Sequence, residues 1–278
     1  MTKIKKLFGG LTMTWKDVLL FAFCAGVYTG LINQVPFLKN TSFTDIAVSY
    51  EVWILFAFII GVNCHRPLEA ACKVFVFFLI SQSVCFLVEI PMIGMNQALL
   101  YFKSWFVQIL LTFPGGFVVY YAKKDNWLGA LVTTMGAVME AFFLAEYGSS
   151  VLHSFPGHLL TTIFCILVIL CFLFFLIKKP LFRWLSLAAV ILVSGYVGMH
   201  DANMMYSYSG SLPGKYTSYQ LKVNDGSYID LENNGQSYTY YFYPYTVKEN
   251  AITFTNDAGS SITYQVVVSN HMVDVVSQ

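Results

Sequence analysis

The sequence predicts a multi-pass α-helical membrane protein followed by a small all-β antiparallel domain, and three observations predict this fold class. First, 57% of the 278 residues are apolar and only 11% are charged, whereas soluble domains carry about a quarter charged residues. Second, seven apolar stretches, each near the length of a membrane span, fill residues 15–199. Third, the chain then becomes rich in Tyr, Asn and Ser and alternates polar with apolar residues, which is the period of a β-strand.

The seven apolar stretches are candidate spans because a helix needs about 20 predominantly apolar residues to cross a bilayer. The second stretch is the shortest and contains a glutamate, Glu51. The first is too long for a cleaved signal peptide, and no small-residue cleavage pattern follows it. The candidates are Trp15–Val35, Ile46–Asn63, Ala71–Ile90, Gln97–Tyr121, Trp127–Tyr147, His158–Ile177 and Leu181–Met199.

The placement of Lys and Arg predicts the orientation, since cytoplasmic loops carry an excess of these residues. With the N-terminus inside, the outer loops hold only Lys39, and the inner segments hold eleven cations. These are Lys3, Lys5, Lys6, Lys16, Arg66, Lys73, Lys123, Lys124, Lys178, Lys179 and Arg183. We therefore predict a plasma (cell) membrane protein with four parts. They are a basic cytoplasmic N-terminus (1–14), a seven-helix transmembrane domain (15–199), a linker (200–215) and an extracytoplasmic β-domain (216–278).

The predicted β-domain has six short strands separated by turn signals, which favours an antiparallel meander curled into a barrel or half-barrel. Tyr238, Tyr240 and Phe242 illustrate the alternation, and we expect half of this tyrosine-rich run to form core. Asn-Gly and Asp-Gly pairs supply the positive φ that tight hairpins need. The turn signals are Asn224-Asp225-Gly226, Asn233-Asn234-Gly235, Lys248-Glu249-Asn250, Asn256-Asp257-Ala258-Gly259 and Ser269-Asn270.

Residues 216–278 resemble, in turn spacing, the lipocalin-like β-meanders of bacterial envelope proteins. The resemblance carries no functional residue across. This segment has no cysteine, and a disulfide-free exported domain favours a bacterial envelope. Three lysines against six acidic residues from Lys215 onward exclude nucleic acid as a partner of this domain. The expected partners are the lipid bilayer and, through the β-domain, a membrane or envelope protein.

Ionisable residues within the outer halves of the spans are the sharpest functional signal. Glu51, Lys103 and Glu140 lie at similar depth, and Glu89 is shallower. Charges in lipid cost at least about 2.5 kcal/mol each, so they are expected to face the bundle interior and find partners. Lys103 and Glu140 form the natural ion pair, which either holds the bundle in register or belongs to an outward-opening pocket. The excess of carboxylates suits a cationic, amine-bearing or metal ligand.

Uncharged polar residues and a proline form a second layer beneath these charges. Gln82 and Gln108 lie there, either hydrogen-bonding between helices or lining a path for a solute. The fourth span also contains Pro114, Gly115 and Gly116. A proline removes a backbone hydrogen bond, so these residues predict a helix break, a feature of transport sites and of plain packing kinks.

No catalytic or cofactor motif is present, and no cofactor is expected. His153 and His158 flank an outer loop and are the weak candidates for a metal site. We expect a binding or accessory protein of the cell envelope, non-enzymatic, with its pocket around Glu51, Glu89, Lys103, Glu140, Gln82 and Gln108. One alternative is a small-solute or cation transporter that uses the broken fourth helix. The other is a membrane-embedded enzyme that uses Glu140 or Glu146 with His153 or His158.

Overall fold

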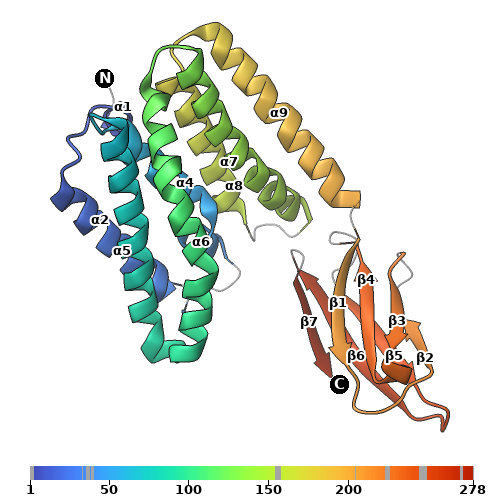
Figure 1. Cartoon of the computed structure of the whole chain (residues 1–278). Helices are drawn as coiled ribbons and strands as arrows, with labels where there is room; N and C mark the ends of the chain where they lie inside the picture. Colours follow the sequence, from blue (N-terminus) through green and yellow to red (C-terminus); the bar gives the residue numbers. More distant parts are fainter. Residues whose placement is uncertain are drawn as a thin grey trace. The chain divides into compact units, whose positions relative to one another are not determined.

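The computed structural model describes residues 3–32, 34–35, 38, 41–153, 158–203, 205–222, 226–243, 249–269 and 272–277. The chain divides into two compact units, Met1–Gly195 and Tyr196–Gln278. The first unit is helical, and the second is built mainly from antiparallel strands (Figure 1). The helical and β classes predicted for the two parts of the chain are both confirmed.

The helical unit begins with a short helix and continues with longer ones joined by brief links. At one of these links, between α5 and α6, Gly94 takes a φ of 84°, a value that glycine adopts without strain. The elements are α1 (Lys3–Leu7), α2 (Trp15–Ile32), α3 (Ser42–Val48), α4 (Tyr50–Val62), α5 (Pro67–Ile93), α6 (Met95–Val119), η2 (Tyr120–Lys123), α7 (Trp127–His153), α8 (Leu159–Cys171), η3 (Phe172–Leu176) and α9 (Pro180–Asn203).

Within the described residues, six helical segments are long and apolar enough to cross a membrane. They are α2, α5, α6 with η2, α7, α8 with η3, and α9. The bent pair α3 and α4 makes a seventh if it counts as one span. The outer surfaces of these helices are apolar too: Leu20 is 65% exposed, Leu111 62% and Leu192 73%. Such a surface suits contact with lipid, because lipid chains are as apolar as these side chains.

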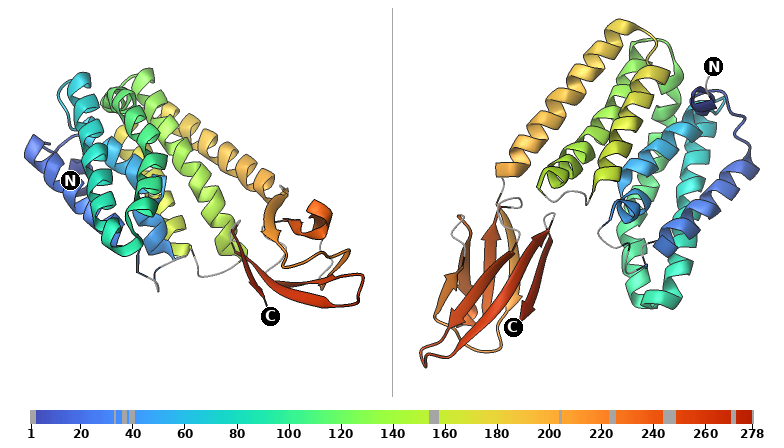
Figure 2. Two further views of the ribbon diagram at one scale, coloured as in Figure 1. Left: turned by 60° about the horizontal axis from the view of Figure 1, so that its bottom comes forward. Right: turned by 180° about the vertical axis from the view of Figure 1, so that it is seen from behind.

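The helix α4 contributes to two apolar cores of the helical unit. Figure 2 shows the helices of this unit from two further sides. Phe58 of α4 stacks on Phe172 at 4.4 Å between ring centroids and joins a core formed with α7, α8 and η3. Trp53 of α4 packs against Phe77 and Phe78 in a second core formed with α2, α5 and α6. A polar residue on α4 is therefore surrounded by helices on several sides.

The helix break predicted at Pro114, Gly115 and Gly116 is wrong, because α6 continues as one helix through these residues. Gly116 instead allows α6 to pack closely on α5: a Cβ here would lie 2.8 Å from the Val74 Cβ and 2.9 Å from the Ala70 oxygen. A single proline removes one backbone hydrogen bond, and the rest of the helix retains its own. Gly116 thus serves helix packing.

The β unit contains seven strands among its described residues, arranged in two antiparallel sheets. The strands are β1 (Tyr206–Ser211), β2 (Ser218–Leu221), β3 (Tyr228–Glu232), β4 (Ser237–Phe242), β5 (Glu249–Thr255), β6 (Ser261–Ser269) and β7 (Met272–Ser277). One sheet has the order β1-β4-β3 and the other β2-β5-β6-β7. The expected single meander is wrong, because β2 pairs with β5 instead of β3, and β4 pairs with β1 and β3 instead of β5. The described strands do not form a closed barrel.

The predicted linker, 200–215, is wrong in both halves. Its first residues belong to α9, which extends to Asn203, and its later residues form β1. In β1, Tyr206, Tyr208 and Gly210 alternate with more exposed serines, so the period of a strand is present. Gly210 lies beneath the ring of Tyr238, where a Cβ would come within 2.6 Å of the ring. The serines and the glycine of this segment therefore belong to a packed strand, in which Gly210 leaves room for the Tyr238 ring.

The expectation that half of the tyrosine-rich run forms core is confirmed. Tyr238, Tyr240 and Phe242 are at most 2% exposed, and they pack with Ile252 and Phe254 of the other sheet. Burial raises the pKa of Tyr238 to about 12. The predicted turn at residues 233–235 is also present, with positive φ at all three residues, including Gly235. Residues 224–225, 248 and 270 of the other predicted turns lie outside the described residues.

Candidate functional site

The polar centre of the helical unit surrounds a bend between α3 and α4. The two helices differ in direction by 47°, and Ser49 is the residue between them. Its Oγ donates a hydrogen bond to the Asp45 carbonyl at 2.5 Å and lies 3.0 Å from the Tyr147 hydroxyl of α7. Helix ends leave backbone groups unpaired, so an interrupted span needs such partners. The bend therefore falls within the second predicted span, whereas α6, which corresponds to the fourth, is a continuous helix.

A partly buried acid and a histidine connect α3 to the start of α8. His158 Nδ1 lies 2.5 Å from Asp45 Oδ2, and the same oxygen accepts a hydrogen bond from Thr161 Oγ1 at 3.0 Å. The Tyr147 ring lies 5.5 Å from the His158 ring, centroid to centroid. Asp45, Ser49, Tyr147, His158 and Thr161 are here called the elbow cluster.

Two glutamates lie fully inside the helical unit near this elbow cluster. Glu51 in the first turn of α4 and Glu140 of α7 are both 0% exposed. Within the described residues, none of their four carboxyl oxygens has a hydrogen-bond partner. The predicted ion pair between Lys103 and Glu140 is wrong, because Lys103 is exposed on α6. Depth in the membrane predicts only how far along its helix a residue lies. It does not predict the direction of the side chain around the helix axis, and Lys103 is exposed whereas Glu140 is buried.

A cavity of about 230 Å³ lies between α2, α5 and α6 and contains two of the predicted site residues. Gln82 and Glu89 of α5, 6% and 5% exposed, contribute its polar surface. Glu89 also interacts with the thiol of Cys85, one turn earlier on the same helix. Aromatic side chains supply much of the remaining wall, namely Phe86, Tyr101, Phe102 and Trp105. We call this the α2–α5–α6 cavity.

A second cavity, of about 270 Å³, lies beside the bend and is almost entirely apolar. Gln108 of α6 lies at its edge, with Nε2 3.5 Å from the Tyr50 hydroxyl. Trp105 borders both cavities, and its ring lies 4.9 Å from the Tyr50 ring. The six predicted ligand-binding residues are therefore divided among two cavities, the buried interior of the bundle and the surface.

The histidines do not form a metal site within the described part of the chain. No group of three or more His, Cys, Asp or Glu side chains comes together there. His158 is bound to Asp45, and the side chain of His153 lies outside the described residues. The proposed catalytic pairing of Glu140 with His158 has no hydrogen bond to support it.

Sequence reasoning missed most of the elbow cluster. Asp45 lies between the first two predicted spans, Trp15–Val35 and Ile46–Asn63, and the polar pattern within the spans does not single out Ser49 or Thr161. The signal that could have found them is the polar run Ser49-Tyr50-Glu51 inside the shortest predicted span. A polar interruption of a span is tolerated only where protein or a cavity surrounds it.

The fold and the site define a class: a helical protein with membrane-length apolar helices, a bent span and a polar interior, followed by a two-sheet β unit. Comparison with protein-family models, with curated proteins and with solved structures finds no match to this chain. The arrangement of its own side chains is therefore the basis for any functional proposal.

Proposed function

We propose that this chain is a multi-pass membrane protein that binds a small cationic ligand in the α2–α5–α6 cavity. The N-terminus is cytoplasmic and the β unit is outside the cell membrane in this proposal. The apolar outer surfaces of the helices support insertion in lipid. Basic segments also lie together at one end of the bundle. There, Asn63 is hydrogen-bonded to the N-terminal segment, and Lys123 is hydrogen-bonded to the α4–α5 link. That end is the cytoplasmic one if cations mark the inner side.

The single observation that carries the binding proposal is Glu89, a buried carboxyl group beside aromatic walls. None of the described residues that line this cavity is Lys or Arg, so the Glu89 carboxyl group favours a cation. A cation over the face of Trp or Tyr gains about 0.5–2 kcal/mol in addition to its attraction to a carboxylate. Sites for drug-sized ligands measure about 300–1,000 Å³, so a cavity of about 230 Å³ suits a small amine.

The cavity belongs to the outer half of the bundle in the proposed orientation. Thr29 lies near the end of α2, Glu89 near the end of α5 and Tyr101 near the start of α6. These positions all lie at the end opposite the basic segments. An outward-facing site of this kind matches a binding or accessory role, with the exported β unit available to a membrane or envelope protein.

Thermal unfolding of the purified full-length protein, with a panel of primary and quaternary amines, tests the binding proposal. We expect at least one small amine to raise the melting temperature, and Glu89→Gln to remove that shift. Glu51→Gln is the matched control, because Glu51 is also buried but does not line this cavity. Equal loss in both variants, or no response of the wild-type protein, would contradict the proposal.

A second candidate function, cation or proton transport, is favoured by the bent span with its buried glutamates. Intramembrane carboxyl groups often mark ion pathways and proton relays, and interrupted helices often form transport sites. Reconstituted liposomes with an internal pH-sensitive dye test it. Transport predicts a proton or cation flux that Glu51→Gln or Glu140→Gln abolishes and Glu89→Gln retains.

A further inference from the structure

A third cavity, of about 420 Å³, opens at the basic end of the helical unit. Four lysines from three parts of the chain line it: Lys5 and Lys6 of α1, Lys123 of η2 and Lys178 after η3. None of the described residues that line it is Asp or Glu. Its remaining wall includes the apolar side chains of Phe175 and Leu176. We call it the basic cavity.

The N-terminal wall of the basic cavity is held by specific contacts. Asn63 donates a hydrogen bond from Nδ2 to the Leu7 carbonyl at 2.6 Å and accepts one from the Leu11 backbone N–H at 2.8 Å. The Phe8 ring, 9% exposed, packs against Phe172 and Phe175 at centroid distances of 6.1 and 5.9 Å. These contacts fix the backbone that carries Lys5 and Lys6.

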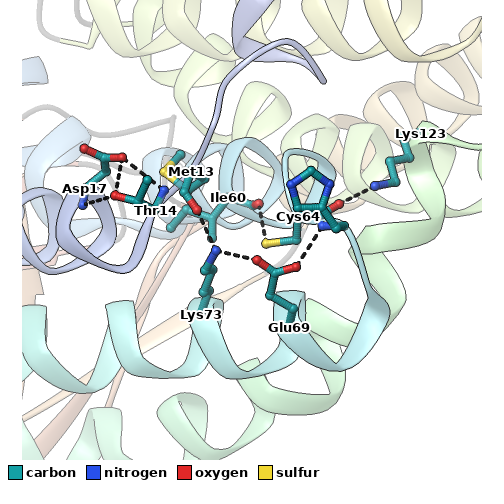
Figure 3. A network of polar contacts seen from close by, with 9 residues as sticks. Met13, Thr14, Asp17, Ile60, Cys64, Glu69, Lys73 and Lys123 are labelled. Atoms are coloured by element: carbon teal, nitrogen blue, oxygen red, sulfur yellow. Dashed lines mark hydrogen bonds and ion pairs between the residues drawn. The ribbon is translucent and has the colours of Figure 1, made fainter.

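The other two walls are also held in place. Lys123 donates to the Cys64 carbonyl, as Figure 3 shows, and lies 4.0 Å from the centre of the Tyr120 ring. Arg183 donates to the Leu173 and Ile177 carbonyls at 3.2 and 2.9 Å, which secures the link that carries Lys178. The fold therefore holds the four lysine side chains around one cavity.

The basic cavity holds more positive charge than its described surroundings neutralise by ion pairs. Among the described residues, none of the four lysines forms an ion pair. A nearby acid on the same face, Glu69, is bound to Lys73 at 2.5 Å and to the His65 backbone N–H at 2.9 Å (Figure 3). An anion with several acceptor oxygens would satisfy the lysines, and phosphate is such an anion.

We propose that the basic cavity binds the phosphate-bearing headgroup of an anionic phospholipid from the surrounding leaflet. Phe175 and Leu176 favour a lipid over free phosphate, because they offer apolar surface beside the charges. Basic pockets between transmembrane helices on the cytoplasmic side are suited to anionic headgroups. The inference rests on the membrane insertion in the proposed function and is independent of the α2–α5–α6 cavity.

Native mass spectrometry of delipidated full-length protein tests this inference, with phosphatidylglycerol, phosphatidylcholine and inorganic phosphate as the three probes. The test variant combines Lys5→Gln, Lys6→Gln and Lys178→Gln. The control combines Lys16→Gln, Lys124→Gln and Lys179→Gln, which removes the same charge from exposed lysines that do not line the cavity. Melting temperatures without lipid report whether each variant folds.

We expect wild-type and control proteins to bind phosphatidylglycerol in preference to phosphatidylcholine. Each lysine near a membrane surface contributes roughly fivefold, so the test variant loses about 100-fold in affinity. If that variant does not fold, the single changes Lys178→Gln and Lys179→Gln give the same comparison at neighbouring positions, and Lys178→Arg retains binding.

Three results would overturn the inference: unchanged phosphatidylglycerol binding in the test variant, equal losses in test and control variants, or no preference over phosphatidylcholine. Competition by inorganic phosphate at the concentrations at which the lipid binds would assign the cavity to a soluble phosphate compound instead. Glu89→Gln retains the lipid, which separates this cavity from the proposed cation site.

Discussion

Asp45 Oδ2 and His158 Nδ1 lie 2.5 Å apart and join α3 to the start of α8. Thr161 donates to the same carboxylate oxygen, and Ser49 donates to the backbone carbonyl of Asp45, so this one residue contacts both the start of α8 and the bend at Ser49. Both side chains are largely shielded from solvent, with exposures of 9% for His158 and 14% for Asp45. Contacts with residues of α7 and α8 therefore stabilise the bend between α3 and α4.

Asp45→Ala is expected to destabilise the helical unit by about 1–3 kcal/mol, because it leaves buried donors on His158 and Thr161 without their acceptor. Thermal unfolding in detergent measures the change. Asp125→Asn is the control, since Asp125 is exposed in the link before α7. A melting temperature equal to that of the wild-type protein would show that the contact contributes nothing.

Glu140→Leu is expected to raise the melting temperature of the helical unit. Glu140 is fully buried, and its carboxyl oxygens have no hydrogen-bond partner within the described residues. Burial of a polar group without a partner costs about 1–3 kcal/mol, and an apolar side chain avoids that cost. Met139→Leu, on the exposed side of the same helix, is the control and is expected to have little effect. Destabilisation by Glu140→Leu would show that the carboxyl group has a stabilising partner.

The sequence predicted the helical part from the length of its apolar stretches and the β part from the alternation of polar and apolar residues. It also predicted that Glu51 and Glu140 are buried within the bundle, because lipid excludes unpaired charge. It failed for Lys103, whose rotation about the axis of α6 depends on neighbours that the local sequence does not specify. A side chain near a helix end can also reach outward to a polar region.

The sequence also predicted the helix break at the wrong place, in α6 instead of between α3 and α4. Pro114 is the stronger local signal, yet α6 tolerates it because the close packing at Gly116 holds the helix against α5. The bend at Ser49 depends on acceptors and donors that are distant in the chain, such as Tyr147. Pairing of β1 with β4 is likewise a long-range choice, so the two-sheet arrangement could not be read from local turns.

Gly115 and Gly116 are expected to respond oppositely to substitution by alanine. A Cβ at Gly115 meets no atom within 4 Å, so Gly115→Ala gains helix propensity worth about 1 kcal/mol. A Cβ at Gly116 would clash with α5, and overpacking typically costs about 1–3 kcal/mol. Melting temperatures of the two variants check this pair. Equal effects would contradict the close approach of α5 and α6.

The stability of the β unit is expected to fall as the pH rises above 10. Burial raises the pKa of Tyr238 from 10 to about 12, so the folded unit holds this proton more tightly than the unfolded chain does. The stabilisation is complete below pH 10 and is lost as the pH rises towards 12. Limited proteolysis of the full-length protein at pH 9 and 11 measures it. Tyr238→Phe removes the titrating group and is expected to be less sensitive to pH over this range. Identical pH responses of the two proteins would refute the role of Tyr238.

The β unit and the basic end of the helical unit are expected to lie on opposite sides of the membrane. Ser260→Cys places a thiol in the exposed turn between β5 and β6, and Lys124→Cys places one in the exposed link before α7. A membrane-impermeant maleimide on intact cells is expected to label the first variant, and the second only after permeabilisation, because the excess of cations holds that link inside. The parent chain, with its native cysteines, measures background labelling. The reverse pattern would overturn the proposed orientation and assign the basic cavity to the opposite leaflet.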